Sequence, residues 1–127
     1  MSIVSHQIHA VELARIASSV LRPEFVNSYF SEEERVLASR SHEGSLKFLA
    51  GRLAAKEAIA KAISVPHGTS RDMLTFAVLQ DDQRNPIIHL SNENRQLALD
   101  KGIRRWLISI AYTETIVVAS VIATSGQ

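Results

Sequence analysis

The longest apolar segment of the chain spans residues 46–63 and carries polar side chains at only a few positions. A helix with so little polar surface is expected to be buried in the folded protein. A start signal near Gly44 and the helix breakers Pro66 and Gly68 bound the segment. Its apolar positions are Leu46, Phe48, Leu49, Leu53, Ala54, Ala55, Ala58, Ile59, Ala60 and Ile63.

Two weaker patterns stand at the beginning of the chain. Residues 3–8 are expected to form a short strand. Residues 10–21 carry apolar side chains at helical spacing, and Pro23 is expected to close that helix. Residues 25–30 are rich in aromatic side chains and are expected to form a link.

A capping box predicts the start of the next helix. Ser31 can accept a hydrogen bond from the backbone of Glu34, and the glutamate side chain can reach back to the backbone of the serine. The helix that follows is expected to reach about Arg40.

The second half of the chain changes to the period of strands. Residues 74–79 and 86–90 are expected to pair as a hairpin around the polar turn at 81–85. Ser91 is expected to cap a short helix that Gly102 ends, because glycine readily adopts the left-handed conformation of a helix stop.

Two further strands are expected at residues 104–112 and 115–124. The second is apolar almost without alternation, so both of its faces are expected to be covered. The whole chain, residues 1–127, then forms a single α+β domain of helices packed on a small antiparallel sheet, because no linker or repeat divides it.

Composition and charge narrow the possible partners. The formal net charge is +1, which predicts no general attraction to nucleic acid or to a membrane surface. The chain has no cysteine, which excludes disulfides and thiolate metal sites and agrees with a reducing compartment. The start of the chain lacks the pattern of a signal peptide, and no apolar stretch approaches the roughly 18 residues of a membrane span. A cytoplasmic location is therefore expected.

Four charged residues interrupt the long apolar helix. Arg52 and Lys56 share one face, as do Glu57 and Lys61. In one interpretation Glu57 and Lys61 form an ion pair within the helix and the arginine reaches solvent along its stem. In the other, the carboxylate and the three cations form a site for metal-bound phosphates, because a carboxylate on a buried helix needs a partner or a metal.

Residues 48–62 read F-L-A-G-R-L-A-A-K-E-A-I-A-K-A. This segment resembles the signature F-L-A-G-R-F-A-A-K-E-A-x-x-K-A of the holo-acyl-carrier-protein synthases, the 4′-phosphopantetheinyl transferases of acyl carrier proteins. Residues 11–16, 29–34, 85–86 and 108–113 are similar to further segments of that family. The resemblance implies a 4′-phosphopantetheinyl transferase-like fold and transfer of 4′-phosphopantetheine from coenzyme A to a serine of an acyl carrier protein.

The resemblance also implies roles for individual residues. Glu57 corresponds to a metal ligand of the family, with Mg²⁺ as the expected ion. The catalytic roles that follow from the resemblance fall on Glu57, Lys61 and His9. Contacts with coenzyme A are implied for Arg52, Lys61, Asn85, Pro86 and Tyr112, and contacts with the acidic carrier protein for Arg15 and Arg22.

The chain departs from the family at the position of the second metal ligand, where His9 replaces an aspartate. An imidazole there is expected to weaken Mg²⁺ binding or to favour Mn²⁺ or another softer divalent ion. Alternatively, His9 acts as the general base that deprotonates the carrier serine, since its ordinary pKa is near 6.5. A third interpretation is a satisfied polar residue in a site that has lost its function.

Two more departures lie near the same site. Tyr112 replaces a histidine of the family; it can still form a hydrogen bond through its hydroxyl and is protonated at neutral pH. Residues 64–66 replace a glycine-rich loop, and Pro66 there lacks an N–H donor.

Three functional hypotheses follow from these observations. The first is an active transferase with an altered metal site. The second is a catalytically degenerate family member that binds carrier protein or coenzyme A without turnover, and the third is a purely structural oligomer. The family forms trimers, and the resemblance implies a homotrimer whose interface includes the C-terminal strands and the helix around Phe48.

Overall fold

A computed structural model describes residues 2–20, 22–63 and 73–126 of the chain. The first half contains the strand β1 (Ile3–Glu12) and then four helices. The described residues of the second half contain four strands and the helix α6. The helices of the first half are α1 (Leu13–Val20), α2 (Pro23–Tyr29), α3 (Glu32–Ser39) and α4 (Ser45–Ala62). The later elements are β2 (Phe76–Gln80), β3 (Pro86–Leu90), α6 (Asn92–Asp100), β4 (Arg105–Tyr112) and β5 (Ile116–Thr124).

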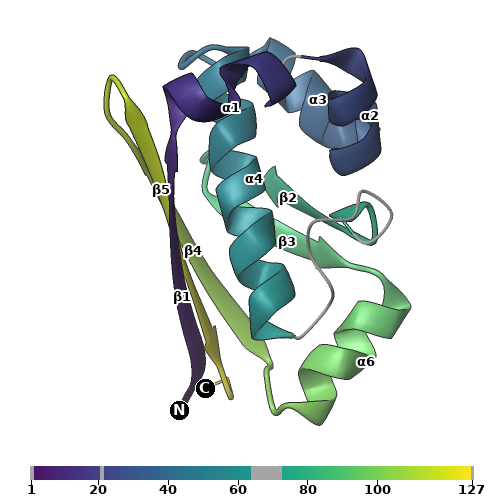
Figure 1. The fold of residues 1–127 in the computed structure, drawn as a ribbon. Helices are drawn as coiled ribbons and strands as arrows, with labels where there is room; N and C mark the ends of the chain where they lie inside the picture. Colours follow the sequence, from purple (N-terminus) through teal and green to yellow (C-terminus); the bar gives the residue numbers. More distant parts are fainter. Residues whose placement is uncertain (1, 21, 64–72, 127) are drawn as a thin grey trace.

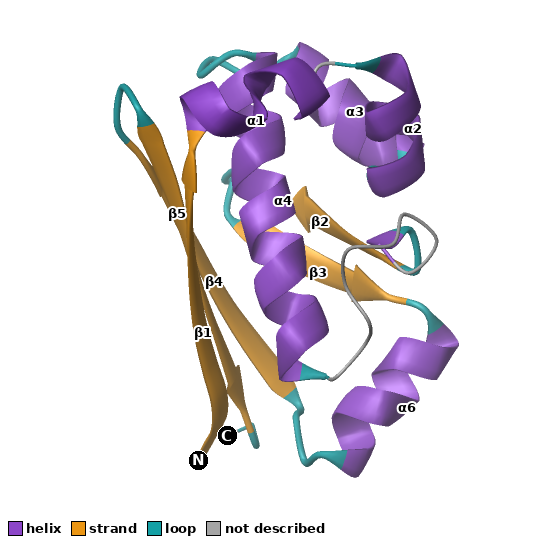
Figure 2. Cartoon of the chain, viewed as in Figure 1, coloured by secondary structure: helices purple, strands orange, loops and turns teal. Residues whose placement is uncertain are grey.

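The strands form two antiparallel sheets rather than the one sheet that the sequence predicts. The larger sheet has the order β1-β5-β4, and the smaller is the hairpin β2-β3. Figure 1 shows α4 between the two sheets, with α1, α2 and α3 gathered at one end and both termini at the other. Figure 2 shows the same arrangement by element type. The α+β class with helices on small antiparallel sheets is confirmed.

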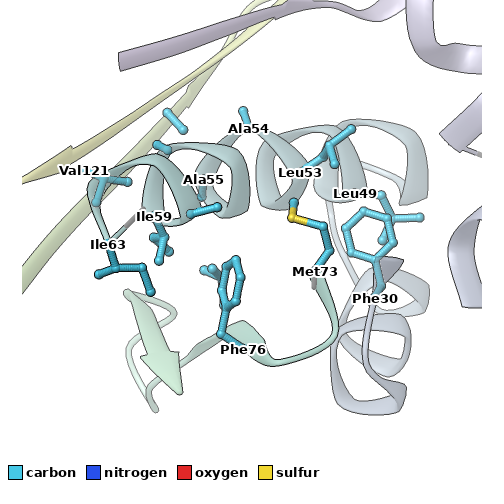
Figure 3. Packing of buried hydrophobic residues seen from close by; sticks show 14 of the residues in the cluster. Phe30, Leu49, Leu53, Ala54, Ala55, Ile59, Ile63, Met73, Phe76 and Val121 are labelled. Atoms are coloured by element: carbon cyan, nitrogen blue, oxygen red, sulfur yellow. The ribbon is translucent and has the colours of Figure 1, made fainter. Parts of the chain in front are cut away.

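Helix α4 forms the centre of the core. Nearly all of its side chains are buried, as its sequence predicts. Figure 3 shows apolar side chains from both sheets and from the α2–α3 segment around this helix. Burial on almost every side of one helix removes more apolar surface from water than a one-sided contact does, so α4 supplies much of the folding free energy.

The boundary between the first strand and the first helix differs from the prediction. Residues 3–12 alternate between exposed and partly buried positions along β1. The strand stays paired with β5 as far as Glu12, opposite Ile116. The helix therefore begins at Leu13 and not at Ala10, because the apolar residues around Val11 satisfy a period of two as well as the helical period.

The prediction of an aromatic-rich link at residues 25–30 is wrong as well, since the helix α2 includes most of this segment. Pro23 stands at the first position of that helix, where proline is favoured because the N–H that it lacks has no partner there. Pro23 therefore begins α2, whereas the sequence analysis expected it only to close the preceding helix. Phe25 and Tyr29 lie one turn apart on α2 and their rings stack 4.3 Å apart.

Several local predictions are confirmed. Ser31 and Glu34 make both hydrogen bonds of the capping box at the start of α3. Ser91 accepts a hydrogen bond from the backbone of Asn94 at the start of α6. Gly102 follows that helix with a φ of 82°, a conformation that glycine adopts at little cost. The breakers Pro66 and Gly68 lie outside the described residues.

The expectation that both faces of the last strand are covered holds for one face only. Along β5, Val117, Ala119, Val121 and Ala123 are buried on the face that α4 covers. The other face of this sheet is open within the chain, and Ile8 on the neighbouring β1 is 61% exposed. No helix in the described part of the chain is long and apolar enough to cross a membrane.

Candidate active site

Arg52 lies inside the protein, although one interpretation of the sequence places it in solvent. Its side chain is only 3% exposed. The guanidinium donates hydrogen bonds to the carbonyl oxygens of Val78 (3.0 Å) and Leu79 (3.2 Å) on β2. It also lies 4.2 Å from the centre of the Phe48 ring. Burial lowers the pKa of Arg52, and the residue fixes α4 against the hairpin.

Lys56 has a structural partner rather than a phosphate-binding role. Both it and Glu34 are fully buried, and their side chains form an ion pair of 3.0 Å. The ammonium also donates a hydrogen bond to the carbonyl of Tyr29 (2.7 Å). The second carboxylate oxygen of Glu34 accepts one from the backbone of Val78 (2.9 Å). Burial lowers the pKa of Lys56 and the neighbouring carboxylate opposes this shift. The predicted site of a carboxylate and three cations therefore does not include Lys56.

A pocket of about 540 Å³ opens beside Arg52. It lies where the loop between α3 and α4, the turn between β2 and β3, and the end of β4 meet. Four residues that the resemblance assigns to coenzyme A line it together: Arg52, Asn85, Pro86 and Tyr112. The fifth, Lys61, lies exposed in the last turn of α4 and does not line this pocket.

The pocket carries more cationic than anionic side chains. Arg40, Arg52 and Arg84 line it, with His42 between the first two in sequence. Glu43 is the acidic side chain among the lining residues that the structure describes, and a hydrogen bond from Ser41 lowers the pKa of its carboxyl. Guanidinium groups bind phosphate oxygens in pairs, so this composition suits a ligand with several phosphates.

No pattern in the sequence selects Arg40, His42 or Arg84 as binding residues. They belong to two polar loops that are about forty residues apart in the chain, and such loops carry no hydrophobic period that could relate them. One weak signal exists at Arg84, which lies in the polar turn and has a φ of 66° there. Only the packing of the hairpin against α4 brings the two loops to one pocket.

Tyr112 packs directly against Gly51 of α4. A Cβ atom added at Gly51 would lie 2.9 Å from the Tyr112 hydroxyl and 2.9 Å from Cγ2 of Ile110. Burial raises the pKa of the Tyr112 phenol, while the charge of Arg52 partly offsets this effect. The phenol is therefore protonated at neutral pH and can donate a hydrogen bond into the pocket.

Substitution of Gly51 by alanine is expected to destabilise the protein despite the higher helix propensity of alanine. The propensity alone favours alanine by about 1 kcal/mol, but the added methyl group overlaps Tyr112 and Ile110, and overpacking typically costs about 1–3 kcal/mol. Thermal unfolding and the near-ultraviolet circular dichroism of tyrosine measure the effect. A rise in stability with an unchanged tyrosine signal would show that the contact is not tight.

The residues proposed for catalysis lie on two elements that pack against each other, β1 and α4. His9 is partly buried and pairs with Ala119 of β5, on the face of the strand that alternates toward the helix. Glu57 is the partly exposed position in an otherwise buried stretch of α4.

A metal ion held by Glu57 and His9 would have to share its coordination with a substrate. No group of three or more histidine, aspartate or glutamate side chains that could hold a metal occurs in residues 2–20, 22–63 and 73–126. Glu57 and His9 offer one carboxylate and one imidazole. Magnesium is usually bound by one or two carboxylates together with substrate phosphates, and an imidazole shifts the preference toward manganese or zinc.

The two arginines that the resemblance assigns to the carrier protein are exposed. Arg15 lies 3.9 Å from Glu12, and Arg22 lies 3.7 Å from Glu24. Exposed pairs of this kind contribute little to stability, so both guanidinium groups can exchange their partners for those of another protein. The predicted change of the glycine-rich loop at residues 64–66 falls outside the described residues.

Comparison with known proteins agrees with this fold. The family model of the 4′-phosphopantetheinyl transferase superfamily matches residues 8–111, and this match defines the class of the protein. A holo-acyl-carrier-protein synthase of Hydrogenovibrio crunogenus is 36% identical over 121 residues, which cover 91% of each chain. One from Natranaerobius thermophilus is 30% identical and covers 97% of this chain and 98% of the relative.

Solved structures of holo-acyl-carrier-protein synthases are also similar to this chain. The structure of the Bacillus anthracis holo-acyl-carrier-protein synthase in complex with coenzyme A (3′,5′-ADP) is 31% identical with a TM-score of 0.76. It covers 99% of this chain and 100% of its own. The Helicobacter pylori enzyme in complex with coenzyme A is 27% identical with a TM-score of 0.77, covering 94% of this chain and all of its own. The chain belongs to the holo-acyl-carrier-protein synthase family.

Proposed function

We propose that this protein transfers the 4′-phosphopantetheine group from coenzyme A to a serine of an acyl carrier protein. The observation that carries the proposal is the pocket beside α4, where Arg52, Asn85, Pro86 and Tyr112 meet. The relatives from Bacillus anthracis and Helicobacter pylori bind coenzyme A. Their likeness to this chain supports the same substrate here.

In this proposal the nucleotide part of coenzyme A occupies the cationic pocket. Arg52 and the newly identified Arg40 and Arg84 neutralise its phosphates, and the Tyr112 hydroxyl donates a hydrogen bond to it. Asn85 and Pro86 contact the nucleotide from the β2–β3 turn. Positioning and charge neutralisation are the main sources of catalysis in phosphoryl transfer, so a preformed cationic pocket suits this reaction.

In the reaction the serine oxygen of the carrier protein forms a bond to the phosphorus that bears the pantetheine. The bond from this phosphorus to the adenosine 3′,5′-bisphosphate breaks, and this nucleotide leaves. We assign removal of the serine proton to His9, since an imidazole accepts protons near neutral pH. Glu57 would hold a divalent cation, Mg²⁺ or Mn²⁺, whose charge would neutralise the diphosphate when bound. In the alternative, His9 would join Glu57 as a ligand of this cation and would not be the base, because a neutral imidazole has a single free lone pair. Lys61 adds a positive charge at the end of α4.

Incubation of the protein with coenzyme A, apo-carrier protein and Mg²⁺ or Mn²⁺ tests the proposal. The expected result is a carrier protein that gains the mass of one phosphopantetheine group, as measured by mass spectrometry, together with release of adenosine 3′,5′-bisphosphate. Boiled protein serves as the control. Absence of any mass increase on every carrier protein of the source organism would contradict the proposal.

A second candidate function is binding of coenzyme A or carrier protein without turnover. The observations that favour it are His9 and Tyr112 at positions where the family has other residues. In that case calorimetry detects binding of coenzyme A while the carrier protein gains no mass. Any measurable affinity for coenzyme A also argues against a purely structural oligomer.

We further propose a homotrimer that is assembled through the open face of the larger sheet. Ile8 and Leu107 lie exposed on this face, 61% and 42% respectively, and large apolar side chains exposed on one open sheet face favour an interaction site there. Phe48 is not available for this interface because it is only 4% exposed and stacks on Arg52. The proposed location is the cytoplasm, and the cysteine-free sequence agrees with a reducing compartment.

Substitution of Ile8 by lysine is expected to convert the trimer into a monomer. The exposed position tolerates lysine in the isolated chain, whereas an unpaired charge inside an interface is costly. Light scattering measures the molar mass of both proteins. Lys47→Gln on α4 is the control and should leave the mass unchanged, and an unchanged mass for Ile8→Lys would remove this face from the interface.

A further inference from the structure

A second pocket lies at the other end of the larger sheet. It has a volume of about 420 Å³ and is formed by β3, α6 and the start of β4. Figure 1 shows these three segments together at the end of the molecule that α6 occupies. It shares no lining residue with the pocket beside Arg52. Its lining residues are Ile88, His89, Leu90, Arg95, Ala98, Leu99, Ile103, Arg104 and Trp106.

The charged side chains of this pocket are all basic. Arg95 lies on the first half of α6, Arg104 directly precedes β4, and His89 is on β3. Neither guanidinium has an ion-pair partner within the part of the chain that the structure describes. No acidic side chain is found among the described lining residues. Guanidinium groups without an internal partner can bind a carboxylate or a phosphate, because both oxyanions accept paired N–H bonds.

The remaining surface of the pocket is apolar. Ile103 and Ala98 are buried at its base, and Trp106 is partly buried against the core. Arg104 immediately precedes β4 and lies two residues before Trp106. Side chains two residues apart along an extended chain point to the same face of the sheet. Ligand pockets commonly combine apolar walls with a few charged groups that fix the orientation of the ligand. This surface suits an aliphatic or aromatic body attached to the anionic head.

We propose that this pocket binds an amphiphilic organic anion, with its carboxylate or phosphate head on Arg95 and Arg104 and its apolar body against Trp106. The proposal does not depend on the transferase activity. Tyr112 and Trp106 stand at opposite ends of β4, six residues or about 20 Å apart. A ligand in this pocket therefore leaves the proposed coenzyme A site free.

The chain contains a single tryptophan, Trp106, which serves as a specific reporter for the test. Octanoate and octyl phosphate, titrated separately into the full-length protein, are expected to change its fluorescence in a saturable manner and to raise the melting temperature. Their comparison distinguishes a carboxylate from a phosphate head. Octanol lacks the anionic head, and acetate and inorganic phosphate lack the long apolar body. These three probes are therefore expected to bind much more weakly.

The variant Arg95→Gln/Arg104→Gln is expected to weaken binding of the preferred probe by at least about tenfold, because hydrogen bonds to a charged group are lost. Arg105→Gln is the matched control. Arg105 is exposed on the opposite face of β4 and does not line the pocket, so its substitution should leave the affinity unchanged. Circular dichroism verifies the fold of each variant, and Arg95→Gln alone replaces the double variant if the latter does not fold.

Three results would overturn the proposal. Octanol that binds as tightly as octanoate would show an apolar pocket without anion recognition. A folded arginine variant with unchanged affinity would remove the guanidinium groups from the site. No saturable change of fluorescence and no heat of binding in calorimetry with any probe would show that the cavity binds none of these anions.

Discussion

Replacement of Lys56 by methionine is expected to lower the free energy of unfolding by about 3–5 kcal/mol, the usual cost of removing one partner from a buried ion pair. Methionine fills a similar volume but leaves the Glu34 carboxylate, which is fully buried, without its cation. The carbonyl of Tyr29 also loses the hydrogen bond that the Lys56 ammonium donates. Chemical denaturation monitored by circular dichroism measures the loss.

Lys61→Met is the matched control, because Lys61 lies exposed on the same helix. Exposed substitutions usually change stability by no more than about 0.5 kcal/mol. A double-mutant cycle with Glu34→Gln isolates the interaction, and the cost of the double variant should be smaller than the sum of the single costs. Strict additivity, or a Lys56→Met variant as stable as the control, would show that the pair does not hold α3 and α4 together.

Replacement of Glu57 by glutamine is expected to reduce phosphopantetheine transfer by at least about a hundredfold. The amide preserves the size of the side chain but removes the negative charge that would hold a divalent cation, and a catalytic cation contributes several kcal/mol to the transition state. Initial rates by mass spectrometry of the carrier protein measure the effect. Glu93→Gln, at an exposed position of α6, is the control.

Substitution of His9 by aspartate gives the reciprocal test of the same site. An added carboxylate creates the oxygen-rich ligand set that magnesium prefers, so transfer with Mg²⁺ should be preserved or improved, and the preference for Mn²⁺ should decrease. Rates with each ion, and the affinity for each ion in the presence of coenzyme A, separate the metal role of His9 from its role as a base. A Glu57→Gln variant with unchanged rate would contradict the metal site itself.

Local sequence signals predicted those elements whose geometry depends on neighbouring residues. The capping box of Ser31 and Glu34, the cap at Ser91 and the stop at Gly102 all appear in the structure. In each case the hydrogen-bond partners or the required backbone conformation lie within a few residues. The apolar circumference of α4 was sufficient to predict its burial.

The predictions failed where one pattern satisfied two structures. Residues around Val11 fit both a strand and a helix, and only the pairing of Glu12 with Ile116 decided for the strand. Pro23 is compatible with the end of one helix and the start of another. The open face of β5 could not be predicted either. An apolar strand in the sequence does not reveal whether its second face is covered by the same chain or by another.

The sequence by itself determined the family, the central helix and its caps, and the residues of the motif from Phe48 to Ala62, because these depend on residue types at short spacing. Only the tertiary structure decided what the charges on that helix do. It paired Lys56 with Glu34, bound Arg52 to the carbonyls of β2 and added Arg40 and Arg84 to its pocket. The physical reason is that a buried charge takes the partner that the packing places beside it, and these partners are distant in the chain.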